Sequence, residues 1–455
     1  MADITIAPST QAHTFIWTET SIERDLSDHF SFIVPGSEYM QKLKKHRWDG
    51  RVRLYSRITK LIPAGLIPRV MKWAAAQGYT VENRCPSHAS NWTELGTEAL
   101  LASHTLPFEI RDYQRTAITY AMHQQRGVLV SPTGSGKSLI LYLLIRARMT
   151  HGPILLIVPT ISLVAQMFTD FESYGWKNAS DSIHCITGGK PKDTDKPVVC
   201  STWQSVFRQP EAWFSRYTTV LGDEAHLFKA KSLSGIMNMI PHCAFRIGVT
   251  GTLDDTKANS LMVEGVFGPP FQVAKTADLQ TQGHLTPIII QGHFLEYGKK
   301  TRWSIKEYHR RYVDEIDYLI QHPGRMNWLV NFVERLPGNV LVLYQFVEKH
   351  GIPLYHAIKK KIGNSRPVYF ISGDVSGENR ERARALLEQA EHVVLDFGGE
   401  PIRCVKDELV PLVGGGSKPA RDLTLEDDVD NAWILNTGIR GMPTIVSTPE
   451  TAILG

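Results

Sequence analysis

The sequence predicts an α/β fold in which two parallel-sheet lobes follow a small α+β accessory domain. Between Phe108 and about Pro270, short apolar segments alternate with helical ones, and a second series of this kind begins at Gly338. Strands that are apolar along their whole length are typical of parallel sheets covered on both faces. The segments that show this in the first series are GVLVSP, ILLIVP, PVVCST, TTVLGDEA and RIGVTGT.

The length and composition fit a multidomain globular protein. The chain has 455 residues, of which 42% are hydrophobic and 21% charged, and domains usually span about 100 to 200 residues. No apolar run approaches the roughly 18 residues that cross a membrane, and the start MADITIAPST lacks the features of a signal peptide. We therefore expect a cytoplasmic protein without a membrane partner. The five cysteines form no CxxC pair, which argues against a zinc site or a disulfide framework.

The pattern along the chain predicts six segments. The first lobe should bind the nucleotide, because it carries the motifs described below. After Glu391 the pattern changes to one that we interpret as β-hairpins. The segments are an accessory domain (1–85), a linker (86–107), the first lobe (108–275), a helical connection (276–336), the start of an incomplete or atypical second lobe (337–390) and a β-rich tail (391–455).

Basic residues are concentrated between Met40 and Lys60, although the formal net charge is only +4. In the sequence this patch is opposed only by Asp49, and we interpret Trp48 to Gly50 as a structural turn. Clustered positive charge favours nucleic acid because each phosphate contact releases counterions. The alternative is a solvated surface face. The patch comprises Lys42, Lys44, Lys45, Arg47, Arg51, Arg53, Arg57 and Lys60.

The segment SPTGSGKS, from Ser131 to Ser138, lies between a predicted strand and a predicted helix. Small residues there let backbone N–H groups point at phosphates, and the helix N-terminus adds its positive dipole. Lys137 is expected to reach the β- and γ-phosphates of ATP, and Ser138 to bind Mg²⁺. The loop residues expected around the phosphates are Thr133, Gly134, Ser135 and Gly136.

About ninety residues later, the segment DEAH follows the apolar strand VLG. The carboxyl end of a parallel strand is where ligands bind, beside the phosphate loop. We expect Asp223 to hold the Mg²⁺ ion and Glu224 to orient and deprotonate the attacking water. His226 is expected to lie at the nucleotide. Acidic residues also end strands as turn formers, but the accompanying phosphate loop favours the catalytic interpretation.

In this order, SPTGSGKS, DEAH and TGT resemble the motifs of superfamily 2 helicases, which have two RecA-like lobes. The resemblance implies that Arg111 and Gln114 in the segment RDYQ bind the nucleotide, with Gln114 reading N6 and N7 of adenine. It also implies that Thr250, Gly251 and Thr252 couple hydrolysis to lobe movement. A plain strand-to-loop turn would use similar residues at TGT.

Two further segments resemble nucleic-acid-contacting segments of these helicases. They are VPTISLVAQ, with Thr160 and Gln166, and STWQS, with Thr202. The resemblance implies that the two threonine hydroxyls donate to backbone phosphates, a contact that positions a strand without reading its sequence. The alternative is that each segment only ends a strand.

Within the N-terminal domain, FIVPGSEYM, HRWDGRVRLY and PAGLIPRV resemble the accessory domain of phage UvsW-type DNA helicases. The resemblance covers residues from about 14 to 390. It implies an ATP-dependent DNA helicase or translocase that acts on branched or duplex DNA in recombination, repair or replication restart. An RNA helicase would use the same ATP chemistry and is the alternative.

The second lobe lacks its expected closing motifs. LVLYQFVEKHG resembles helicase motif IV, but no Q-x-x-G-R-x-x-R segment follows, and Arg440 is a poor substitute. Because an arginine finger contributes about 10³ to 10⁵ in turnover, the chain alone could bind ATP and DNA with little hydrolysis. The tail is consistent with a mosaic reading frame, with a second polypeptide that completes the lobe, or with an inserted self-splicing element.

Overall fold

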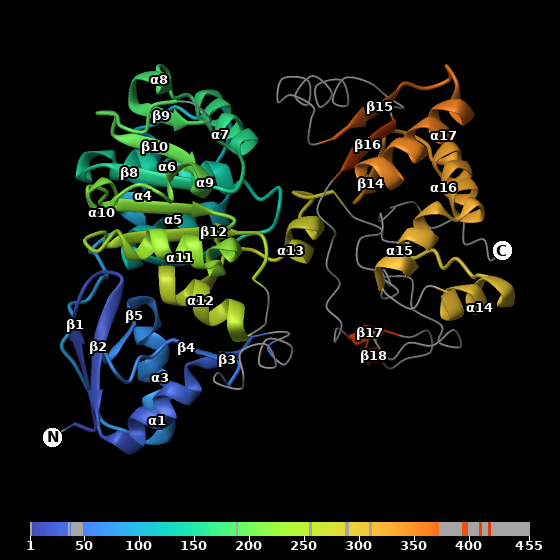
Figure 1. Ribbon diagram of the computed structural model, residues 1–455. Helices are drawn as coiled ribbons and strands as arrows, with labels where there is room; N and C mark the ends of the chain where they lie inside the picture. The colour runs from blue at the N-terminus through green and yellow to red at the C-terminus, as the bar shows by residue number, and fades with distance from the viewer. Residues whose placement is uncertain are drawn as a thin grey trace. The chain divides into compact units, whose positions relative to one another are not determined.

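The computed structural model describes residues 2–34, 37, 49–187, 190–253, 257–286, 291–308, 312–372, 394–398, 409–411 and 417–419. The chain forms two compact units, Met1–Thr286 and Pro287–Gly455 (Figure 1). Within the described residues, no helix combines the length and the apolar character that crossing a membrane requires.

The accessory domain is a four-stranded sheet packed against helices. Alternate residues of its first two strands are buried, so that Ile4, Ile6 and Ile16 enter one core with Leu66. Gly78 ends the helix α3 in a left-handed conformation (φ 79°). The elements are β1 (Ile4–Pro8), β2 (His13–Thr18), α1 (Thr20–His29), β3 (Ser31–Ile33), β4 (Arg51–Arg53), β5 (Leu61–Pro63), η1 (Ala64–Leu66), α3 (Ile67–Gln77) and β6 (Val81–Asn83).

The sheet order is β5-β2-β1-β6, and β3 pairs separately with β4 in antiparallel register. The stretch predicted as a linker, residues 86–107, contains the helix α4 (Glu94–Ala102). This helix places Leu100 in the core of the following lobe, and Trp92 Nε1 donates to Thr97 Oγ1 at 3.0 Å. The segment is therefore packed structure, because its apolar residues have a lobe surface to cover.

The first lobe contains a seven-stranded sheet whose pairings are all parallel, in the order β13-β7-β12-β11-β8-β10-β9. The predicted parallel sheet of this lobe is thus confirmed, with two short edge strands, β9 and β13, in addition. The strands are β7 (Arg126–Val130), β8 (Ile154–Val158), β9 (Ile183–Ile186), β10 (Val198–Thr202), β11 (Thr219–Asp223), β12 (Phe245–Thr250) and β13 (Pro270–Gln272).

Helices cover both faces of this sheet. Alternate residues of β8 enter different cores: Leu156 packs with residues of α5, α6 and α7, whereas Leu155 packs with residues of α10, α11 and α12. The helices are α5 (Asp112–Gln124), α6 (Lys137–Arg148), η2 (Met149–His151), α7 (Ile161–Ser173), α8 (Ala179–Ser182), α9 (Trp203–Val206), α10 (Glu211–Ser215), η3 (Ala225–Lys229), α11 (Lys231–Asn238), α12 (Lys257–Phe267) and α13 (Thr276–Thr281).

The second unit contains a smaller parallel sheet of order β14-β16-β15. Its strand β16 (Val394–Gly398) falls in the segment that we interpret from sequence as hairpins, and that interpretation is wrong here. The strand instead pairs in parallel with both β14 (Val340–Tyr344) and β15 (Val368–Ile371). The remaining elements are α14 (Lys299–Tyr308), α15 (Tyr312–Gln321), α16 (Pro323–Arg335), η4 (Val347–Gly351), α17 (Ile352–Ile362), β17 (Leu409–Pro411) and β18 (Ser417–Pro419).

The short strands β17 and β18 do pair in antiparallel register, as a hairpin requires. The stretch 276–336, predicted as a helical connection, contains α14, α15 and α16, and α16 packs in one core with β14 and α17. Arg440 lies outside the described residues, so its role as an arginine finger stays a prediction.

Candidate active site

Three predicted motifs meet at the carboxyl edge of the large sheet. The phosphate loop follows β7, the DEAH segment begins at the end of β11, and the TGT segment ends β12, which lies between them. Ser131 N donates to Thr250 O at 2.8 Å. A Cβ atom on Gly251 would lie 3.5 Å from Lys137 Nζ. The fold thus brings the three motifs within contact distance.

Contacts among its own residues hold the conformation of the phosphate loop. Gly134 and Gly136 have φ of 78° and 85°, values that favour glycine. Ser135 Oγ donates to Pro132 O at 2.6 Å. Lys137, the first residue of α6, has its Nζ 3.4 Å from both Ser131 O and Pro132 O. These contacts are long, so the ammonium can turn toward a phosphate at little cost.

The segment predicted to bind adenine is hydrogen-bonded to the phosphate loop. Gln114 is only 4% exposed. Its Oε1 accepts from Arg111 N at 3.0 Å, and its Nε2 donates to Ser135 O at 2.9 Å. An amide has two donor and two acceptor positions, so one of each remains. Tyr113, which the sequence reasoning missed, also donates to Ser135 O at 2.9 Å, and Arg111 Nη1 donates to Tyr113 Oη at 2.8 Å.

The two carboxyl groups of the DEAH segment differ in their environments. Asp223, at the end of β11, is 6% exposed. Burial and, second, the charge of Glu224 raise the pKa of Asp223 to about 6. A hydrogen bond from His226 lowers the pKa of Glu224 despite its partial burial. Glu224 is therefore the more readily ionised of the pair.

A hydrogen-bonded network joins the DEAH and TGT segments. His226 Nδ1 lies 3.2 Å from Glu224 Oε2 and 2.9 Å from Thr250 Oγ1. Thr250 Oγ1 donates to Thr252 O at 2.9 Å and lies 3.4 Å from Glu224 Oε2. Glu224 itself has a left-handed backbone (φ 49°, ψ 56°), a conformation that is strained for a residue other than glycine. The network fixes the orientation of its carboxylate.

The oxygen atoms beside the loop suit a hard divalent cation. Asp223 Oδ1 is buried and has no hydrogen-bond partner among the described residues. Ser138 Oγ is hydrogen-bonded to Tyr174 Oη at 2.7 Å, a partner that the sequence did not reveal. A carboxylate and a hydroxyl are ligands typical of Mg²⁺, which usually keeps waters and nucleotide phosphates as its other ligands. The pair therefore fits Mg²⁺ carried by a nucleotide.

Such a site depends on the nucleotide for the rest of its ligands. In the described part of the chain, no group of three or more His, Cys, Asp or Glu side chains could hold a metal ion.

Of the residues predicted to contact nucleic acid in the first lobe, two are exposed to solvent. Thr160 and Gln166 are exposed, and Thr160 Oγ1 caps α7 by accepting from Leu163 N at 3.3 Å. Thr202 ends the neighbouring strand β10 but is only 2% exposed, and its hydroxyl pairs with Ser205 Oγ at 2.9 Å. A phosphate contact by Thr202 stays a prediction that requires this side chain to become accessible.

The described part of the basic patch is balanced by more acidic groups than the sequence indicates. Arg53 Nη2 lies 2.7 Å from Asp49 Oδ2 and 3.5 Å from Asp28 Oδ1. Glu23 forms ion pairs with both Lys60 and Arg57. Asp49 is the only acidic residue within the patch in the sequence, and the fold adds two further carboxylates from α1. Arg51 lies on β4 with Arg53, whereas Lys42, Lys44, Lys45 and Arg47 lie outside the described residues.

Known proteins match this chain over most of its length. The family described as "DNA helicase UvsW, N-terminal" matches residues 3–83, and the one described as "Type III restriction enzyme, res subunit" matches residues 107–255. The ATP-dependent DNA helicase uvsW of Enterobacteria phage T4 is 31% identical over 399 residues, which cover 84% of this chain and 78% of the relative. The DNA 3'-5' translocase XPB2 of Sulfurisphaera tokodaii is 28% identical over 35% of each chain.

Solved structures give the same result. The crystal structure of T4 UvsW matches with a TM-score of 0.56 and 30% identity, over 86% of this chain and 79% of that one. A second UvsW crystal structure from this phage matches with a TM-score of 0.55 and 34% identity, over 59% of this chain and 99% of that one.

The parallel-sheet fold and these relatives define the class of protein: the chain is a superfamily 2 DNA helicase, an enzyme that hydrolyses ATP. Within that class it belongs to the UvsW helicase family. The predicted fold class is confirmed, and the helicase relatives favour DNA over RNA as the nucleic-acid partner.

Proposed function

We propose that this chain is an ATP-driven translocase that acts on branched or duplex DNA in recombination, repair or replication restart. The observation that carries the proposal is the network of Glu224, His226 and Thr250 beside the phosphate loop. It links a carboxylate suited to activating water to the segment expected to move with the lobes. Such a link is what a motor needs to couple hydrolysis to movement.

In this proposal the loop and the DEAH segment divide the steps of ATP binding and hydrolysis between them. Lys137 neutralises the β- and γ-phosphates, and the backbone of residues 133–136 surrounds them. Ser138 and Asp223 hold Mg²⁺, which neutralises developing phosphate charge. Glu224 orients the attacking water and accepts its proton; its lowered pKa keeps the carboxylate ionised for this role, and its contacts with His226 and Thr250 fix its position. Gln114 reads the adenine with its remaining donor and acceptor.

DNA is proposed to run along the surface where β8 and β10 end. Thr160 and Gln166 face solvent there, and contacts of this kind go to the phosphate backbone. The basic patch that includes Arg51 and Arg53 is proposed to hold a second part of the DNA. A branched substrate suits two separate phosphate-binding surfaces, which is the reason to prefer it over a simple single strand.

ATPase measurements with and without forked DNA test this function. We expect DNA-stimulated hydrolysis by the wild-type chain, and a loss of at least about 10²-fold in Lys137→Ala and Glu224→Gln, because each removes a charge used in the transition state. Lys177→Ala is the matched control, since Lys177 is an exposed lysine of the same lobe. The proposal fails if the wild-type chain hydrolyses no ATP with any DNA.

A second candidate function is an ATP-dependent DNA-binding switch with little turnover. The absence of a Q-x-x-G-R-x-x-R segment from the sequence favours it. In that case ATP should change the affinity for forked DNA while the rate of hydrolysis stays at background. Comparing the full chain with a version that ends at Gln389 shows whether the tail contributes to either property.

A further inference from the structure

The helix α12 belongs to two hydrophobic cores at once. Leu261 is 2% exposed and packs in the core of the accessory domain together with Ile62 and Leu66. Val263 and Phe267, on the same helix, pack in the core beneath the large sheet of the first lobe. A rigid helix shared by two cores transfers its displacements from one to the other.

The accessory domain touches this helix backbone to backbone. Gly65 lies in the turn η1, and a Cβ atom there would be 2.7 Å from Gly265 O and 2.9 Å from Gly268 N. Any side chain at this position would push the turn away from the end of α12. This close backbone contact therefore opposes sliding of the accessory domain along α12.

One ion pair fixes the orientation of this contact. Arg69 Nη1 on α3 lies 3.0 Å from Glu264 Oε2 on α12, and it lies 3.4 Å from Ser260 Oγ. Glu264 is 6% exposed, and burial raises its pKa while Arg69 opposes that rise. A buried carboxylate is costly without a partner. The ion pair of Glu264 with Arg69 therefore fixes the rotation of α3 relative to α12.

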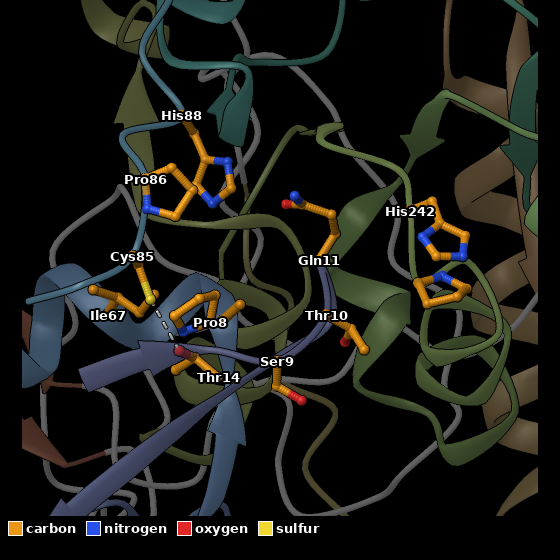
Figure 2. Close-up of a pocket in the computed structure, with 12 residues that line it drawn as sticks. Pro8, Ser9, Thr10, Gln11, Thr14, Ile67, Cys85, Pro86, His88 and His242 are labelled. Atoms are coloured by element: carbon orange, nitrogen blue, oxygen red, sulfur yellow. Dashed lines mark hydrogen bonds between the residues drawn. The ribbon is translucent and has the colours of Figure 1, made fainter. Parts of the chain in front are cut away.

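A second contact joins the accessory domain to the strand that leads to the phosphate loop. Arg126, the first residue of β7, donates to Gln11 O at 2.7 Å and to Val266 O at 3.2 Å. Gln11 N donates in turn to Pro241 O at 2.7 Å. A cavity of about 220 Å³ lies beside this contact, and Figure 2 shows Gln11 and His242 among the residues that line it. The contact between the accessory domain and the first lobe is therefore closely packed at α12 and leaves a cavity near Gln11.

The helix also follows the candidate active site in the chain. It begins at Lys257, shortly after Thr252, which accepts the hydrogen bond from Thr250. We infer that α12 carries the nucleotide state of the active site to the accessory domain, with Arg69 and Glu264 as positioning residues that set how DNA on that domain stimulates hydrolysis. This inference rests on the proposed function. It goes further in naming the path and the residues.

The functional test is a charge swap across the junction. In Arg69→Glu, two carboxylates face each other, and we expect hydrolysis without DNA to stay within about twofold of wild type. We expect the DNA-stimulated kcat to fall on the order of tenfold, as is usual for coupling between sites, while the KM for DNA changes little. The double variant Arg69→Glu, Glu264→Arg should recover most of the stimulation. Arg84→Glu is the control, because Arg84 pairs with Glu82 on the exposed strand β6.

Three results would overturn the inference. The first is unchanged DNA stimulation of hydrolysis in Arg69→Glu. The second is an equal loss of the basal and the DNA-stimulated rates in that variant. The third is a double variant whose stimulation is no higher than that of Arg69→Glu. The second result would mean that the pair only stabilises the fold. Arg69→Ala keeps the inference testable if the glutamate variant does not fold, with a smaller loss of stimulation expected.

Hydrogen–deuterium exchange tests the same path without turnover. On binding of a non-hydrolysable ATP analogue with Mg²⁺, the backbone amides of residues 64–67, 69 and 70 should change their exchange rates in wild type and not in Arg69→Glu. If wild type shows no change there, the inference is overturned even if the ATPase is stimulated by DNA. If the exchange rates change in wild type but the protein hydrolyses no ATP, the path through α12 is supported and the proposed function fails.

Discussion

Two adjacent carboxyl groups, Asp223 and Glu224, have pKa values shifted in opposite directions. Burial raises the pKa of Asp223 to about 6, whereas a hydrogen bond from His226 lowers that of Glu224. The different environments follow from the backbone, because Asp223 ends a fully buried strand and Glu224 turns out of it in a left-handed conformation. The proposed cation ligand and the proposed general base can therefore be adjacent in the chain.

Replacing Asp223 by Asn should stabilise the nucleotide-free protein while abolishing ATPase. The folded pKa of Asp223 is raised from 3.8 to about 6. Its contribution to stability is therefore full below about pH 4 and is lost as the pH rises through about 6. At pH 7 the ionised group costs on the order of 2–3 kcal/mol, which Asn avoids. Thermal denaturation at pH 7 measures this, with exposed Asp181→Asn as control; a lower melting temperature in Asp223→Asn would contradict it.

The rate of ATP hydrolysis should fall as the pH drops through about 6. Protonated Asp223 cannot hold Mg²⁺, and its raised pKa puts that protonation in this range. Because Mg²⁺ and the proton compete for one carboxylate, higher Mg²⁺ should move the midpoint of the pH–rate profile to lower pH. A midpoint that does not respond to Mg²⁺ would exclude Asp223 as the group responsible.

Sequence reasoning located the motif residues of this site but not their supporting partners. Lys137, Ser138 and Glu224 lie in short segments whose chemistry depends on local spacing. Tyr113 and Tyr174 contact the loop through tertiary packing that no local pattern shows. The roles of all these side chains remain predictions for the experiments above.

At the scale of elements, the apolar central strands were predictable and the edge strands were not. A strand covered on both faces must be apolar throughout, as in β8 and β11. β9 is only partly buried and β13 is three residues long, so neither produces that pattern. The strand β16 is mostly apolar in sequence, and its partners β14 and β15 are not adjacent to it in the chain. A strand of a hairpin would have the same local sequence pattern, so the sequence did not distinguish the two.

The network between the DEAH segment and β12 should behave as one unit. His226→Ala and Thr250→Val each remove one partner of Glu224, and we expect each to lower kcat about 10- to 100-fold with little effect on ATP binding. Groups that act together give non-additive losses, so the double variant should lose scarcely more than either single one. Fully multiplicative losses in the double-mutant cycle would show that the contacts act independently.

At the scale of the whole molecule, the sequence predicts the α/β class and the kind of enzyme because the motifs occur in a fixed order. It could not show that the accessory domain and the first lobe share α12. Leu261 lies in a helix that reads as part of the first lobe, and only the fold places its side chain in the other core. Packing between distant segments leaves no periodic signal.

Shortening Leu261 should therefore destabilise both parts of the first unit. Leu261→Ala leaves a cavity in the core of the accessory domain, and such changes cost about 2–5 kcal/mol. Differential scanning calorimetry should show a lower melting temperature for a single shared transition of that unit. The exposed Leu95, at 81% exposure, is the control, and Leu95→Ala should have little effect. A separate early transition for the accessory domain alone would contradict the shared helix.

The central claim is that Glu224 activates water in a DNA-stimulated ATPase. The most direct measurement is single-turnover hydrolysis of ATP by the full chain with forked DNA, compared with Glu224→Gln under the same conditions. The account predicts rapid hydrolysis by wild type, and in Glu224→Gln normal ATP binding with at least about 10²-fold slower hydrolysis. Hydrolysis by Glu224→Gln at the wild-type rate would contradict it.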